Sequence, residues 1–139
     1  LNQTYIFHLI ADWQSFIETL VKDKFNTIQA IQKGHNLNSV LTNNLENKLK
    51  RFNTPNTENI DLLFKEVLGI TKITECFNQK GITRNFAKGK LDKILKARHQ
   101  IAHMGSTTHD INYESNFKDM EFIFNLATFL QDEMTNYKY

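Results

Sequence analysis

Proline, glycine and cysteine are all scarce in this chain. Its 139 residues include one proline, five glycines and one cysteine. Turn-dense all-β folds depend on glycine and proline for their tight turns, so this composition argues against such a fold. The lone Cys76 excludes an intramolecular disulfide framework and a zinc site built from cysteines. The length suits one domain, and we expect residues 1–139 to form it.

Long apolar runs and recognisable sorting signals are absent as well. No run of about 18 apolar residues occurs, which a membrane-spanning helix would need. No charged segment followed by a short apolar core and a small-residue cleavage site is visible. The chain starts with Leu1 rather than Met, as expected of a domain excised from a longer protein, whose targeting signals can lie elsewhere. We therefore expect a cytoplasmic protein that does not contact membranes.

Charge is nearly balanced in total, at +2, but it is unevenly distributed. Residues 1–79 carry eight basic and eight acidic side chains. Residues 80–98 carry seven basic side chains against Asp92 alone, and residues 99–139 carry two lysines against six acids. A basic segment is therefore followed by an acidic one. The basic segment suits either a solvated helix face or a surface that binds nucleic-acid phosphates.

Apolar residues recur at helical spacing along the whole chain. The pattern predicts helices near residues 6–31, 37–52, 57–68, 91–105 and 114–137, with a short helix at 73–77. The first helix is long for a globular protein, so a break near Asp23 is an alternative. Thr57 is the candidate N-cap of the third helix, and residues 82–89 have no clear assignment. We predict an all-α fold, an up-and-down bundle of five or six helices.

The last predicted helix has an unusually wide apolar surface. One face contains Phe117, Met120, Ile123, Phe124, Ala127, Leu130 and Met134. Phe122, Leu126 and Phe129 widen this surface beyond the roughly 100° stripe of an ordinary surface helix. Either this helix is central in the bundle, or part of it contributes to a dimer interface.

Arg98 lies within an apolar helical stripe. The stripe contains Leu91, Ile94, Leu95, Ile101 and Ala102. An arginine at such a position must be paired, or must face a cavity or an interface, because burying an unpaired guanidinium is very costly. A structural arginine that binds a carboxylate or helix carbonyls is the alternative to a functional one.

His99 and His103 are four positions apart and so share one face of the same helix. Such a pair can bind a metal, but no third ligand is nearby and the HExxH pattern is absent, so we expect neither a metal nor a cofactor. Imidazole also gives and takes protons near neutral pH, which suits acid–base catalysis. His8, His35 and His109 are expected at the surface or its edge, and His109 follows closely enough to reach the same site.

The arginine and the histidines do not converge on one helix. On an ideal helix Arg98 and His103 are separated by about 140° of rotation and about 7.5 Å of rise. Two copies of the helix that meet across a two-fold axis would pool these residues in one cleft. The arginine would neutralise a phosphate and the histidine would transfer the proton, so this arrangement predicts a homodimer.

The stretch from Leu91 to Gly105, LDKILKARHQIAHMG, resembles the signature of HEPN domains. That signature is an arginine, usually followed by a polar residue, with a histidine shortly after it. Arg98, His99 and His103 match these positions, although His99 stands where Asn or Asp is also common. The surrounding residues are similar to those of bacterial RiboL-PSP-type HEPN domains, and the resemblance would cover the whole chain.

The resemblance implies a metal-independent endoribonuclease, often a toxin or antiviral effector that an antitoxin or sensor domain holds in check. Many such proteins are homodimers that cut single-stranded regions of tRNA or mRNA. By similarity, His103 would be the acid or base, Arg98 would bind the phosphate, and His99 would assist.

The basic segment that leads into Arg98 then has an expected use in RNA binding. Its candidate contacts are Lys88, Lys90, Lys93 and Lys96. The alternative is a HEPN module without catalysis that binds RNA or dimerises within a larger protein. A purely structural helical adaptor is the third reading, and it predicts no salt-sensitive RNA binding.

Overall fold

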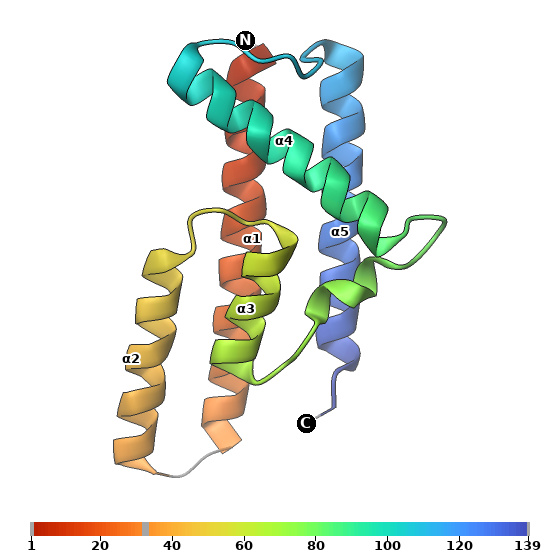
Figure 1. Cartoon of the computed structure of the whole chain (residues 1–139). Coiled ribbons are helices and arrows are strands. Elements are labelled where there is room, and N and C mark those ends of the chain that lie inside the picture. The colour runs from red at the N-terminus through yellow and green to blue at the C-terminus, as the bar shows by residue number, and fades with distance from the viewer. Residues whose placement is uncertain (1, 32–33, 139) are drawn as a thin grey trace.

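The computed structural model describes residues 2–31 and 34–138 and contains five α-helices and one short 3₁₀ helix (Figure 1). In chain order they are α1 (Asn2–Ile31), α2 (His35–Arg51), α3 (Thr57–Leu68), η1 (Ile73–Phe77), α4 (Arg84–Met104) and α5 (Tyr113–Asn136). The described ranges contain no strand beyond a single bridge between Gln79 and Ile82. The predicted all-α fold class and the helix number are therefore confirmed.

Helix α1 is the scaffold of the domain, since α3, α4 and α5 all pack against it. The axes of α1, α2, α3 and α5 run roughly along one direction, whereas α4 crosses α1 at a steep inclination (Figure 1). Helix α2 packs mainly on α3, and η1 lies against α5, α3 and α4. The inclination of α4 carries its last turns over the N-terminal end of α1 (Figure 1).

Helix α1 continues through Asp23 without a break. Leu20, Val21 and Phe25 are all buried on both sides of this position, so the apolar face that binds the rest of the domain is uninterrupted. A helix that buries apolar side chains from Ile6 to Phe25 gains enough from packing to exceed the average length.

The helix ends follow local capping chemistry. The N-cap of α3 is Asn56, whose side chain accepts a hydrogen bond from the Asn59 N–H at 2.8 Å. The prediction that Thr57 caps this helix was wrong by one residue, because Thr57 is already helical and fully buried. Thr83 caps α4 by accepting from the Phe86 N–H at 3.1 Å, so the segment without a predicted structure is the first turns of this helix.

The buried face of α5 is only partly the predicted one. Its C-terminal half buries Ile123, Leu130 and Met134 as expected. In contrast, Phe117, Met120 and Phe124 remain 51%, 40% and 69% exposed. The first half of the helix turns another face toward the bundle, and that face begins with Asn116 and Asp119. Tyr113 is exposed on the same side, so α5 carries an exposed apolar stripe of Tyr113, Phe117, Met120 and Phe124.

Candidate functional site

The last turns of α4 are fixed to the start of α1. Ala97 and Ile101 form a small buried cluster with Ile6, and Ile111 packs against it. The Gln3 side chain donates a hydrogen bond to the carbonyl of Gly105 at 3.2 Å. Gly105 has a φ of 72° and ends the helix where the sequence predicted, which leaves His103 in its last turn.

Arg98 is half-buried and faces the connection between α2 and α3. Its Nη2 atom lies 3.5 Å from the backbone oxygen of Asn53, a long hydrogen bond to a loop carbonyl rather than an ion pair. Its guanidinium group has five N–H donors, so most of its capacity is left for another acceptor such as a phosphate. Ala102, which was expected on the buried stripe with Arg98, is exposed, because the last turns of α4 turn Ala97 and Ile101 toward α1 instead.

The loop that Arg98 contacts is itself held by α1. The buried Trp13 Nε1 donates to the carbonyl of Pro55 at 3.0 Å. The Gln14 side chain donates to the carbonyl of Phe52 at 2.8 Å. These bonds hold the loop on both sides of Asn53, the residue whose carbonyl Arg98 contacts.

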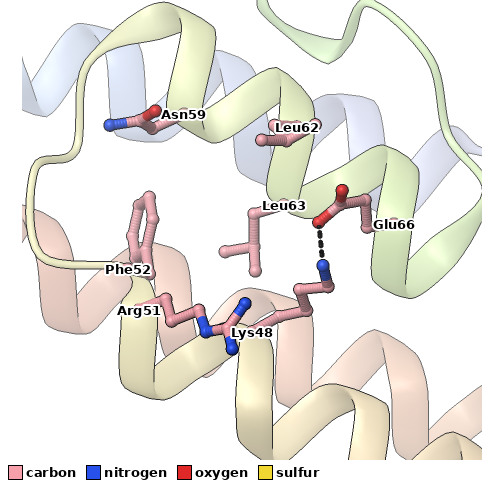
Figure 2. A pocket seen from close by; sticks show the side chains of 7 residues that line it. All are labelled: Lys48, Arg51, Phe52, Asn59, Leu62, Leu63 and Glu66. Carbon is pink, nitrogen blue, oxygen red and sulfur yellow. Dashed lines mark ion pairs between the residues drawn. The ribbon is translucent and has the colours of Figure 1, made fainter.

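A shallow pocket of about 220 Å³ lies beside this loop, between α2 and α3 (Figure 2). Buried Phe52 and Leu63 line it, and Lys48 and Glu66 form an ion pair of 2.8 Å across it. Lys48 and Glu66 neutralise each other, Arg51 is the third charged side chain of the lining, and we assign no ligand to this shallow pocket.

His99 and His103 are both exposed and lie against each other. Their ring centroids are 4.3 Å apart, with an angle of 51° between the ring planes. Met104, the residue after His103, is 67% exposed. No group of three His, Cys, Asp or Glu side chains in residues 2–31 and 34–138 is placed to hold a metal ion. Exposed imidazoles can give or take protons, or bind an anion.

Within one chain the structure does not bring Arg98 and His103 to one point. Arg98 points toward Asn53, and the two histidines lie on the exposed side of α4. This agrees with the large rotation between the two positions on a helix. One chain therefore supplies two separate halves of a possible phosphate site.

The four predicted RNA-binding lysines are in different environments. Lys88 is engaged, because it forms ion pairs with Glu58 and with Asp92. Its hydrogen bond lowers the pKa of Glu58 and raises its own. The Lys90 amine lies 4.9 Å from the centre of the Phe122 ring in a cation–π contact.

Lys93 and Lys96 are exposed, and neither has an ion-pair partner in the described part of the chain. Of the four predicted lysines, these two can therefore bind a phosphate without first breaking an ion pair. Arg84, from the same basic segment, serves the fold instead, since it binds Asp61 and Thr74.

One pair of side chains in this region was missed at the level of sequence. His109 Nε2 and Asp119 Oδ2 are 2.9 Å apart, and Asp119 is only 3% exposed. Burial and, second, the charge of Asp119 raise the pKa of Tyr5.

His109 was expected at the surface or its edge and is half-buried; His8 is exposed, and the His35 side chain lies outside the described residues. The sequence offered one signal for the pair of His109 and Asp119: Asp119 lies three positions before Phe122, and so it shares a helix face with a residue that is buried.

Comparison with known proteins identifies the family of the chain. The model of the RiboL-PSP-HEPN family matches residues 1–136. No curated protein and no solved structure matches the chain. No helix in residues 2–31 and 34–138 is long and apolar enough to cross a membrane.

Proposed function

Because the chain belongs to the RiboL-PSP-HEPN family over residues 1–136, we propose that it is a metal-independent endoribonuclease with a composite site in a homodimer. HEPN domains are generally associated with ribonuclease activity, and the family implies an RNA substrate. The family match covers the Arg98–His103 motif and almost all of the chain.

The proposed reaction needs only proton transfer and charge stabilisation. The 2′-hydroxyl of RNA attacks the adjacent phosphorus and loses its proton to a base. The bond to the 5′-oxygen breaks, and that oxygen receives a proton from an acid, so a cyclic phosphate and a free 5′-hydroxyl form. His103 is the proton carrier, His99 assists it, and Arg98 stabilises the charge that develops on the phosphate.

The single observation that carries the proposal is the separation of Arg98 from the two exposed histidines on α4. Arg98 binds the loop at Asn53, while His99 and His103 are open to a partner. If a second copy of α4 faced the first, Arg98 of one chain would lie near His103 of the other, and each pair would form one complete site. The exposed Met104 next to the histidines fits a protein contact there.

A dimer of two different variants tests the composite site. Arg98→Ala and His103→Ala are co-expressed with different tags, and the mixed dimer is purified. Its cleft retains one arginine and one histidine, from different chains, so we expect about half of the wild-type cleavage with a chelator present. Each variant alone is expected to be inactive. An inactive mixed dimer, or a wild-type protein that is monomeric while it cleaves RNA, contradicts the composite site.

A second function is favoured by the unpaired cations Lys93 and Lys96. These would let the domain bind RNA even without catalysis, as a HEPN module of a larger protein. Binding without cleavage by the wild-type dimer would support this function. A role as a toxin or phage-defence effector, with an antitoxin or sensor domain as partner, is part of the proposal and is inferred from the family alone.

A further inference from the structure

The loop that follows the motif is folded back onto the bundle by hydrogen bonds. His109 is bound to the buried Asp119 of α5, and its backbone N–H donates to Thr107 Oγ1 at 3.1 Å. Thr107 in turn donates to the Gln100 side chain of α4 at 2.6 Å. The imidazole of His109 is therefore held in one place at the side of α4 rather than free in solvent.

Two hollows meet at this imidazole. The larger, of about 380 Å³, is lined by Asn85, Phe86, Gly89, Lys90, Lys93 and His109. The smaller, of about 240 Å³, is lined by Lys93, Lys96, Gln100, Thr108 and His109. Since the two share Lys93 and His109, they form one depression along α4, which we call the His109 groove.

The chemistry of the His109 groove suits a nucleotide. Phe86 is 58% exposed, an unusual state for a large aromatic ring, and Gly89 has no side chain to obstruct the space beside it. Aromatic rings of this kind stack on bases without sequence preference. Lys93 and Lys96 supply cations that no described carboxylate neutralises, and RNA phosphates bind such cations.

The groove also continues toward the motif. Lys96 lies three residues before His99, so the two share a face of α4. The helix rises about 15 Å between Lys93 and His103, so a single nucleotide does not span both. A strand that follows α4 would pass from the groove to the histidine pair.

We propose that the His109 groove binds a part of single-stranded RNA that flanks the cleaved bond, with a base on Phe86 and phosphates at Lys93, Lys96 and His109. Asp119 is a positioning residue that acts through His109. The assignment rests on the proposed function for RNA as the substrate, but its test does not depend on cleavage.

Binding of a 2′-O-methyl RNA oligonucleotide to the wild-type protein, with chelator present, measures the groove separately from catalysis. This probe lacks the nucleophilic hydroxyl and therefore stays intact. We expect Phe86→Ala to weaken binding about fivefold or more without changing the salt dependence. Lys93→Gln should weaken binding and lower the slope of log affinity against log salt by about 1.

Lys88→Gln is the matched control, because Lys88 lies on the same helix but is paired with Glu58 and Asp92. It should bind the oligonucleotide like the wild type. His109→Ala and Asp119→Asn should weaken binding by similar factors, and combining them should add little to either alone. Phe86 and Lys93 are exposed, so their variants keep the proposal testable if the Asp119 variant unfolds.

Binding by Phe86→Ala and Lys93→Gln that equals binding by Lys88→Gln would overturn the proposal. Adenosine monophosphate is the second probe: if it binds the wild type more tightly than the oligonucleotide does, the groove is a site for a free nucleotide and not for RNA. Cleavage that survives His103→Ala would overturn the proposed mechanism but would leave these binding results unaffected.

Discussion

The imidazole rings of His99 and His103 lie with their centroids 4.3 Å apart on the exposed side of α4. The contact places both imidazoles at one spot on the surface of the last turns of α4. In the proposed mechanism they differ, because His103 transfers the proton and His99 supports it.

The two histidines should therefore differ in the effect of their removal. We expect His103→Ala to lower kcat for RNA cleavage by about 10²–10⁴-fold, the usual contribution of a general acid or base. His99→Ala should lower it less, with KM nearly unchanged in both variants. Single-turnover cleavage with chelator measures this, and His8→Ala, an exposed histidine on α1, is the control. Full activity of His103→Ala would contradict the assignment.

The stability of the loop that binds Arg98 should depend on the buried indole of Trp13. Trp13→Phe retains an aromatic ring but removes the donor to the carbonyl of Pro55. Leaving a buried carbonyl without its partner should lower the free energy of unfolding by about 1–3 kcal/mol. Urea denaturation measures the change, and RNA cleavage should fall more than for other variants of equal stability. An unchanged unfolding midpoint would show that this bond does not stabilise the loop.

Much of this organisation was predictable from local signals. Helix α3 ends at Leu68, as the predicted range 57–68 had it, and Gly105 ends α4; both caps are left-handed glycines, Gly69 and Gly105, and such a cap needs only its own residue and the preceding turn. The motif residues were located at the C-terminal end of α4 for the same reason. The family resemblance, carried by the residues from Leu91 to Gly105, is confirmed by the match over residues 1–136.

What was not predictable depends on partners distant in sequence. The buried face of α5 begins at Asn116 and Asp119, because Asp119 is satisfied by His109 from a loop. Hydrophobic periodicity cannot reveal such a pair, since it ranks polar residues as exposed. The environments of Lys88 and Lys93 differ for the same reason, because only Lys88 meets a carboxylate from α3.

The lone cysteine should be unreactive in the folded protein. Burial, followed by the charges of Glu133 and Asp61, raises the pKa of Cys76 from 9.0 to about 12. At a pH below both pKa values, the thiolate fraction is about a thousandfold smaller than for a free thiol. Alkylation of Cys76 should slow by a similar factor. Iodoacetamide at pH 8 should modify Cys76 slowly in buffer and rapidly in concentrated urea. Equal rates in the two conditions would contradict the protection of this partly buried thiol.

Gly89 inside α4 and Gly105 at its C-cap should respond in opposite directions to alanine. Gly105 has a φ of 72°, and no atom lies within 4 Å of an added Cβ, so Gly105→Ala costs only the backbone strain of about 1–2 kcal/mol. Gly89 lies inside the helix with open space around it, so Gly89→Ala should stabilise the protein by about 0.5–1 kcal/mol. Thermal unfolding of both variants tests this pair. Gly105→Ala should also reduce cleavage, because the strain acts on the turn that carries His103.

The exposed stripe of Tyr113, Phe117, Met120 and Phe124 should affect assembly rather than folding. Phe124 is 69% exposed, so Phe124→Glu removes little buried surface and should leave the unfolding free energy within about 0.5 kcal/mol. A contiguous exposed apolar stripe marks a protein contact, and we expect the charge to shift the protein toward monomer in sedimentation velocity. Gln131→Glu, exposed two turns beyond Phe124 on the same face of α5, tests whether the charge acts only within the stripe. If Phe124→Glu remains dimeric while cleavage is intact, the stripe is not part of the active dimer, and the contact must be formed by the exposed end of α4 near Met104.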